Sequence, residues 1–131
     1  MTSLPAPDPH EVVVLAAHGS RAAAANDAHR AVVARLAEQA PTRVVPAFLE
    51  LTEPSIAEAI DVAIAGGAST VAVLPYFLHP GRHLTEDLPR IVAEATDRHA
   101  GVAVRLASSF GADPALGEVL AAQVARSLDG A

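Results

Sequence analysis

Three side chains that can bind a metal ion or move a proton follow three separate apolar segments of the sequence. His18 comes directly after the first segment, Glu50 ends the second, and His83 follows the third. Two neutral imidazoles and one carboxylate suit divalent ions such as Co²⁺, Fe²⁺, Ni²⁺ or Zn²⁺ better than Mg²⁺ or Ca²⁺. Three protein ligands leave coordination positions open, so a bound ion could pass to a substrate. The histidines could equally act as general acids and bases, because imidazole titrates near neutral pH.

Each of these residues also has an interpretation without function. His18 could simply be the polar residue that ends a strand, Glu50 a solvated carboxylate, and His83 a helix cap. Three other histidines are interpreted as surface side chains: His10, His29 and His99. His79 stands in the turn after the third segment, where it is either an extra ligand or, as we favour, an exposed side chain. A functional interpretation therefore depends on whether the fold brings the three candidates to one place.

Short apolar runs alternate with helical patterns along the chain. The predicted strands are 12–17, 43–51, 70–78 and 102–107, and the predicted helices are 22–39, 54–65, 84–98 and a last helix after Asp113-Pro114. This alternation predicts one flavodoxin-like α/β domain, with about four parallel strands and helices on both faces of the sheet. Ligands bind outside the carboxyl ends of the strands in such sheets. That edge is where the three candidate residues are expected.

Apolar residues at helical spacing predict which side of each helix packs on the sheet. The predicted buried stripe of helix 22–39 is Ala25, Ala28, Val32 and Leu36, and that of the last helix is Leu116, Leu120, Val124 and Leu128. Helix 54–65 is expected to have Pro54 in its first turn, after a cap at Thr52 or Glu53. Helix 84–98 tolerates Pro89 only if it begins near Asp87.

Composition excludes several classes of protein. The chain has 131 residues and no cysteine, which excludes disulfides, thiolate metal sites and iron–sulfur clusters. A net charge of −6 without a basic stripe argues against binding nucleic acid. No run approaches the roughly 20 apolar residues of a membrane helix. We expect a flexible leader at residues 1–10, a single domain at 11–131, and a cytoplasmic location.

Four stretches of the sequence resemble a known family. They are AHGSR (17–21), FLELTEPSIAEAI (48–60), LPYFLHPGRHLTEDLP (74–89) and SSFGADPALGEVLAAQ (108–123). Together they resemble the short-form CbiX-type sirohydrochlorin chelatases, which belong to the class II tetrapyrrole chelatases. The most specific part is H-G-S-R combined with P-x-F-L-x-x-G-x-H-x-x-x-D-x-P, which here runs from Pro75 to Pro89.

The resemblance implies a lyase that inserts Co²⁺ or Fe²⁺, with Ni²⁺ as a further option, into sirohydrochlorin in cobalamin or siroheme biosynthesis. The metal ion is then a co-substrate, and no organic cofactor is expected. In such an enzyme His18 and His83 would be catalytic, and together with Glu50 they would hold the metal ion. Of the family's two forms, the long one joins two such domains in one chain. A single domain leaves one side of the cleft open, so we expect a homodimer.

Sirohydrochlorin carries many carboxylates, which a chain of net charge −6 repels overall. All nine positively charged side chains are arginine, and Arg21 and Arg82 lie beside the two candidate histidines. A planar guanidinium suits carboxylates, so both are expected to bind substrate together with Ser20. Ser20 itself is better interpreted as a loop or helix-capping residue than as a nucleophile.

Two other functions compete with this interpretation. A carrier of the same fold could bind Co²⁺ or Ni²⁺ without inserting it, and the sequence does not separate binding from turnover. Histidine phosphatases also place a His-Gly pair after a first strand. Their motif needs an arginine directly before the histidine, where this chain has Ala17.

Overall fold

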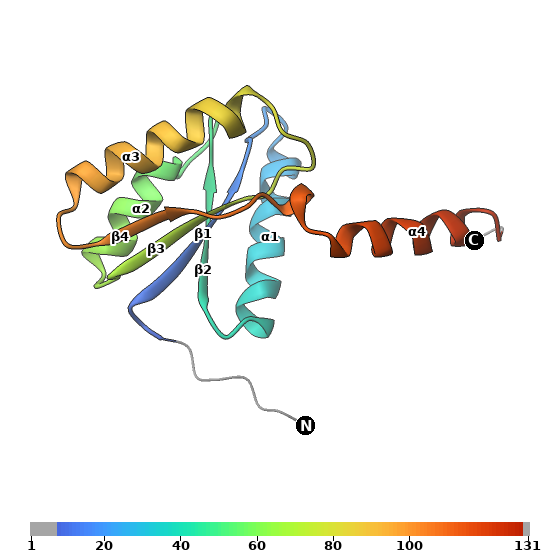
Figure 1. Cartoon of the computed structure of the whole chain (residues 1–131), viewed down its shortest axis with the longest axis horizontal. Helices are drawn as coiled ribbons and strands as arrows, with labels where there is room; N and C mark the ends of the chain where they lie inside the picture. The colour runs from blue at the N-terminus through green and yellow to red at the C-terminus, as the bar shows by residue number, and fades with distance from the viewer. Residues whose placement is uncertain (1–7, 130–131) are drawn as a thin grey trace.

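The computed structural model describes residues 8–129 and shows a four-stranded parallel sheet (Figure 1). The strands are β1 (Glu11–Ala17), β2 (Arg43–Phe48), β3 (Thr70–Pro75) and β4 (Ala103–Leu106), and the helices are α1 (Ala23–Gln39), α2 (Ile56–Ala65), α3 (Leu88–Arg98) and α4 (Ala115–Ser127). The spatial order of the strands is β2-β1-β3-β4, with every neighbouring pair parallel. The predicted α/β class and the four parallel strands are confirmed.

The element boundaries explain two proline positions. Pro46 lies in β2, which is an edge strand and therefore tolerates a residue without an N–H group. Pro89 lies in the first turn of α3, as expected for a helix that begins after Asp87. Strand β3 ends at Pro75, three residues earlier than predicted.

Of the predicted leader, residues 1–7 lie outside the described part of the chain. The last leader residue, His10, is attached to the body. Its carbonyl accepts hydrogen bonds from the backbone N–H groups of Ser69 at 2.8 Å and Thr70 at 3.1 Å, at the start of β3.

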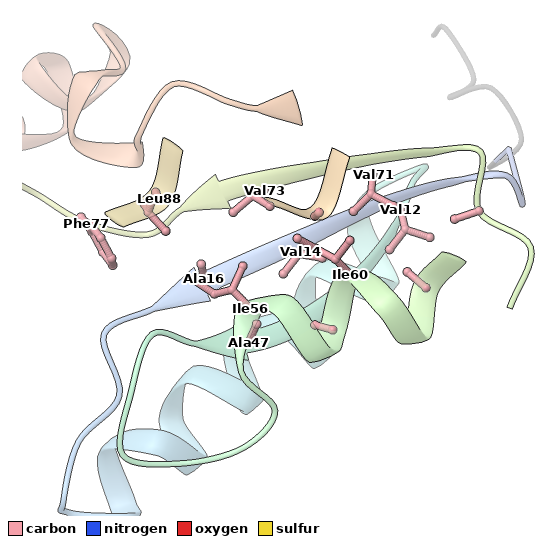
Figure 2. Packing of buried hydrophobic residues seen from close by; sticks show 14 residues of the cluster. Val12, Val14, Ala16, Ala47, Ile56, Ile60, Val71, Val73, Phe77 and Leu88 are labelled. Atoms are coloured by element: carbon pink, nitrogen blue, oxygen red, sulfur yellow. The ribbon is translucent and has the colours of Figure 1, made fainter. Parts of the chain in front are cut away.

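Helices α2 and α3 cover one face of the sheet and bury the main core (Figure 2). Strand and helix side chains meet there in a cluster that includes Val14, Val73, Ile56, Ile60 and Leu88. Helix α2 begins with a capping box, in which the Ser55 hydroxyl accepts from the Glu58 N–H and the Glu58 carboxylate accepts from the Ser55 N–H. The predicted cap at Thr52 or Glu53 is therefore wrong.

Helix α1 lies on the opposite face and packs on β2. Its buried residues are Asn26, His29 and Val33, so the predicted stripe through Ala25 and Ala28 is wrong. The assignment of His29 to the surface is also wrong. Its Nε2 donates to the Leu15 carbonyl at 2.9 Å, which offsets the cost of burying an imidazole. Hydrogen bonds made by buried polar groups, rather than apolar spacing, set the rotation of this helix.

Helix α4 differs most from the prediction. It was expected to pack on the sheet through its apolar stripe, but it projects away from the body (Figure 1). Within the described part of the chain, none of its residues is buried. Helices do cover both faces, through α1 on one side and α2 with α3 on the other. None of the helices described in the structure is long and apolar enough to cross a membrane.

Candidate functional site

The carboxyl end of the sheet brings His18 and His83 together, as predicted. Their ring centroids are 5.5 Å apart, and the two rings are close to perpendicular at 71°. The ring of the buried Phe77 lies under His18, with centroids 4.0 Å apart and an angle of 17° between the planes. Phe77 thus fixes the plane of the exposed His18 ring from below. The two histidines come from separate strand ends, which the sequence could place only through the topology.

The loop after β1 is packed directly against the loop after β2. Gly19 has a φ of +89°, and a Cβ atom at this position would lie 1.9 Å from the Glu50 carbonyl oxygen. The Glu50 N–H in turn donates to the His18 carbonyl at 3.1 Å. Only glycine allows this close approach of the two backbones. The next residue along, Leu51, has a φ of +72°, a left-handed conformation that is rare for a leucine.

Asn26 holds the same loop from below. This buried side chain accepts from the Ser20 N–H at 2.9 Å and donates to the Ser20 carbonyl at 2.8 Å, so its amide pairs with one residue twice. The Ser20 hydroxyl accepts from the Ala22 N–H at 3.0 Å. Ser20 therefore has the loop-stabilising contact expected of it.

His83 is positioned by Asp87 within a single π-helical turn, His83–Asp87, that leads into α3. The distance from His83 Nδ1 to Asp87 Oδ2 is 2.6 Å. Because an ionised carboxylate only accepts, Nδ1 carries a proton, and in the neutral imidazole Nε2 then has the lone pair. The hydrogen bond from His83 lowers the pKa of Asp87 below its ordinary value, and this outweighs the opposing effect of burial. A carboxylate behind an imidazole is the usual support of a metal-binding histidine.

The other predicted site residues lie at the rim of this edge. Glu50 is exposed, and within residues 8–129 no three His, Asp or Glu side chains are grouped to hold a metal ion. The structure thus pairs the two histidines without drawing Glu50 into a cluster with them. Arg21 is exposed, and Arg82 reaches solvent with its Nε 3.7 Å from the Glu86 carboxylate. His79 is exposed, as expected.

All four aromatic residues of the chain gather at the same edge: Phe48, Tyr76, Phe77 and Phe110. Tyr76 contacts Phe110, with ring centroids 5.0 Å apart, and stacks near the buried His29 at 5.9 Å. The low aromatic content of the chain does not reveal this concentration, because composition carries no information about position. Phe77 and Asp87 lie inside the longest recognised motif, whereas no local pattern marks Asn26.

A hollow of about 640 Å³ lies beside this edge, between the turn at Leu78-His79 and helix α4. It is lined mainly by apolar side chains of α4, including Leu116 and Leu120. A smaller apolar groove of about 150 Å³ lies between β2 and α2, near the amino ends of the strands at Val12 and Arg43. A third hollow, of about 330 Å³, also lies at the carboxyl end of the sheet and is lined by Leu74, Phe110 and Pro114 among others.

Comparison with known proteins identifies relatives of this chain. The family model described as CbiX matches residues 12–127. A chloroplastic sirohydrochlorin ferrochelatase from Arabidopsis thaliana is 34% identical over 76% of this chain and 44% of its own length. A sirohydrochlorin cobaltochelatase from Methanocaldococcus jannaschii is 35% identical over 68% of this chain and 63% of its own. The chain thus spans less than two thirds of either relative.

Solved structures show the same fold. A putative cobalamin biosynthesis CbiX protein from Marinobacter aquaeolei has a TM-score of 0.77 at 30% identity, covering 92% of this chain and 99% of that one. The sirohydrochlorin chelatase SirB from Bacillus subtilis subspecies spizizenii, in complex with cobalt, has a TM-score of 0.79 at 27% identity. That alignment covers 91% of this chain and 50% of SirB.

Proposed function

This chain belongs to the CbiX family, and from that premise we propose that it inserts a divalent metal ion, Co²⁺ or Fe²⁺, into sirohydrochlorin. The observation that carries the proposal is the pair of imidazoles, His18 after β1 and His83 before α3, whose ring centroids lie 5.5 Å apart at an open edge of the sheet. The names of the relatives support sirohydrochlorin as substrate and both metals as candidates.

The reaction exchanges one metal ion for two protons on the pyrrole nitrogens. His18 and His83 would bind the incoming ion as nitrogen ligands, and once the ion passes to the macrocycle the same ring nitrogens would be free to accept the two departing protons. The Nε2 lone pair of His83 is available for this, because Asp87 occupies Nδ1. A site with a few nitrogen and oxygen ligands can release its ion to the macrocycle, whereas a closed thiolate cage could not. Glu50, at the adjoining strand end, is proposed as the third ligand.

Arg21, Arg82 and Ser20 are proposed to bind the macrocycle. The two guanidinium groups are exposed beside the histidines and would attract the carboxylates of sirohydrochlorin. They would offset locally the net charge of −6. Ser20 contributes through the loop that it stabilises beside Arg21.

The histidine edge is open to solvent on one side, and we propose that a second copy of the chain closes it. Activity in the cytoplasm and the use of Ni²⁺ remain predictions of the sequence. A carrier that binds the ion without inserting it would use the same two histidines, so the test must measure turnover as well as binding.

The test is to mix the protein with sirohydrochlorin and Co²⁺ or Fe²⁺ without oxygen and to follow the absorbance change of metallation. We expect acceleration over the uncatalysed rate, and a return to that rate in the double variant His18→Ala/His83→Ala. His79→Ala is the matched control, because it removes an exposed histidine from the segment that connects β3 to His83. Full activity in the double variant would falsify the proposal, and tight metal binding without acceleration would favour the carrier.

A further inference from the structure

Leu51, in the loop after β2, combines a strained backbone with an exposed apolar side chain. Its φ of +72° lies in the left-handed region, and within residues 8–129 it is the one residue other than glycine with a positive φ. The residue is 56% exposed. Glycine or asparagine would adopt this conformation at a lower cost in free energy. Burial in the core of its own chain therefore does not explain why a leucine stands at this position.

Contacts on both sides of Leu51 hold the loop in this conformation. Before it, the Glu50 N–H donates to the His18 carbonyl at 3.1 Å. After it, the Arg30 guanidinium donates to the Glu53 carbonyl at 3.0 Å. A strained backbone persists only where the surrounding contacts over-determine it, and such positions cluster at ligand sites. The conformation of Leu51 therefore points to a binding function for this loop.

The loop of Leu51 lies beside the candidate site. In the sheet, β1 lies between β2 and β3, so the residues after β1 have the ends of both neighbouring strands beside them. The end of β3 leads to Phe77, which stacks on the ring of His18. The end of β2 leads to Leu51, directly after the residue whose carbonyl oxygen excludes a Cβ atom at Gly19. A substrate that reaches His18 thus meets the loop of Leu51.

The proposed substrate presents a surface for which the site needs one more contact. The macrocycle of a tetrapyrrole is broad and mostly apolar, and its carboxylates lie on the periphery. In the proposed function the histidines bind the metal ion and the arginines bind the carboxylates, which leaves the ring itself without a contact. An exposed leucine next to the metal site offers one, because burying apolar surface against the ring is favourable.

We propose that Leu51 contacts the apolar ring of sirohydrochlorin and holds it beside His18, and that Arg30 is the positioning residue that keeps Leu51 in place. The inference rests on the proposed function, because it assigns a further contact with the same substrate. It means that the left-handed leucine is retained for binding, at a cost in stability. Substitutions should therefore change stability and substrate binding in different directions, which substitutions of a merely structural residue would not do.

The first test is Leu51→Gly, which removes the side chain and suits the positive φ. The KM for sirohydrochlorin should rise about 10-fold with kcat nearly unchanged, because the bound substrate makes the lost contact throughout the reaction. The midpoint of urea unfolding should not fall, since the left-handed strain is relieved. Leu51→Asn also tolerates this conformation but is polar, and it should give a similar rise in KM.

Two further variants separate the apolar contact from other effects. Leu51→Met keeps an unbranched apolar side chain, so its KM should lie closer to that of the unchanged chain than to that of Leu51→Gly. Val62→Ala shortens an apolar side chain of α2 that is 70% exposed and lines the groove between β2 and α2, and its KM should be unchanged. An unchanged KM in Leu51→Gly, an equal rise in Leu51→Met, or a lowered urea midpoint in Leu51→Gly would overturn the inference.

The second test concerns Arg30. Arg30→Met removes the hydrogen bond to the Glu53 carbonyl and keeps an aliphatic stem near the ring of Phe48, whose centroid lies 4.9 Å from the guanidinium carbon. The KM should rise, but less than in Leu51→Gly. In the double variant it should rise no further than in Leu51→Gly alone, because Arg30 acts only through Leu51. Arg35→Met removes the same charge from an exposed position of α1 and should leave the KM unchanged. Equal effects at Arg30 and Arg35, or additive effects in the double variant, would overturn the positioning role.

Binding of metal-free sirohydrochlorin, followed by its absorbance, separates this inference from the proposed function. If the unchanged chain binds the macrocycle without accelerating metallation, the chelatase proposal fails, and the role of Leu51 is then judged on the dissociation constant, which should rise about 10-fold in Leu51→Gly. If the unchanged chain binds and metallates but Leu51→Gly binds equally tightly, only the role of Leu51 fails. An unchanged chain that binds no sirohydrochlorin would overturn both.

Discussion

The two histidines of the site are held in different ways. His18 is placed by its backbone and by stacking: Gly19 locks its loop against the β2 end, and Phe77 supports its ring. Within residues 8–129, no hydrogen bond is made by the His18 ring itself. His83 is placed by charge, through the 2.6 Å contact between its Nδ1 and Asp87.

This difference suggests how the two residues divide their work. The Asp87 contact fixes the tautomer of His83 and directs its Nε2 lone pair outward, which suits a ligand that must meet an ion in one orientation. Within residues 8–129 no hydrogen bond fixes the tautomer of His18, so either of its ring nitrogens can be the one that accepts a proton. Substitutions at Gly19 and Asn26, which hold the loop of His18, and at Asp87, which holds His83, test this division.

Removing the close approach at Gly19 should have the largest effect. Gly19→Ala introduces a Cβ atom 1.9 Å from the Glu50 carbonyl oxygen and an unfavourable positive φ. We expect a loss of roughly 3 kcal/mol in the free energy of unfolding, together with loss of metallation activity. Urea titration followed by circular dichroism measures the first quantity.

Gly67→Ala is the control for this substitution. Gly67 also has a positive φ, of 109°, but nothing lies within 4 Å of a Cβ atom there. It should cost only about 1 kcal/mol, which is the conformational part alone. An equal cost at both glycines would mean that the two loops separate without penalty, and the account of His18 would then be wrong.

Asn26→Ala should have the next largest effect. It removes two hydrogen bonds to the backbone of Ser20 and leaves a partly buried N–H and carbonyl without partners. We expect a loss of about 2 kcal/mol in the free energy of unfolding and a slower metallation rate, because the loop of His18 loosens. Asp27→Ala, on the exposed side of the same helix, should change stability by less than about 0.5 kcal/mol. Similar results for both variants would remove Asn26 from the support of the site.

Asp87→Asn tests the charge behind His83. An asparagine side-chain oxygen can still accept from Nδ1, so the ring stays oriented while the negative charge is lost. We expect metallation to slow by about 10- to 100-fold with little change in stability. Glu94→Gln removes an exposed carboxylate of α3 that lies 3.5 Å from the exposed Arg90, and it should leave the rate near that of the unchanged chain. Unchanged metallation in Asp87→Asn would mean that orientation alone is sufficient.

The sequence predicted the parts of the fold that follow from repeated local patterns. Alternating apolar runs and helical stretches are enough to specify a parallel sheet, and topology then places His18 and His83 at one edge. The motif spacing also included Asp87, although its role was visible only from the 2.6 Å contact to His83.

The missed features depend on contacts between distant segments. The rotation of α1 follows from hydrogen bonds of Asn26 and His29 to other parts of the chain, which apolar periodicity does not report. The apolar stripe of α4 was predicted to pack on the sheet, but within residues 8–129 none of the helix is buried. Apolar spacing marks a surface on a helix and does not report where the connection before the helix directs it.

The same Asp–His pairing occurs a second time, away from the site. Asp61 of α2 accepts from His99 Nε2 at 2.7 Å and from Arg98 at 2.9 Å, at the end of α3. Partial burial acts to raise the pKa of Asp61, but the hydrogen bonds from His99 and Arg98, with the charge of Arg98, outweigh it and lower the pKa. This second pair joins two helices and lies near neither His18 nor His83.

Asp61→Asn is therefore the counterpart of Asp87→Asn, and its effect should be the smallest. A carboxyl with a lowered folded-state pKa stabilises fully above its unfolded pKa of about 3.9, and this is lost as pH falls through the lower folded value. Because the pair is half exposed, we expect a loss of only about 0.5 kcal/mol at pH 7. In urea titrations the difference from the unchanged chain should hold down to about pH 5 and shrink progressively as the pH falls below the unfolded pKa of about 3.9. The metallation rate of Asp61→Asn should equal that of the unchanged chain. If Asp61→Asn slowed metallation as much as Asp87→Asn does, the effect of both substitutions would come from lowered stability and not from the orientation of His83.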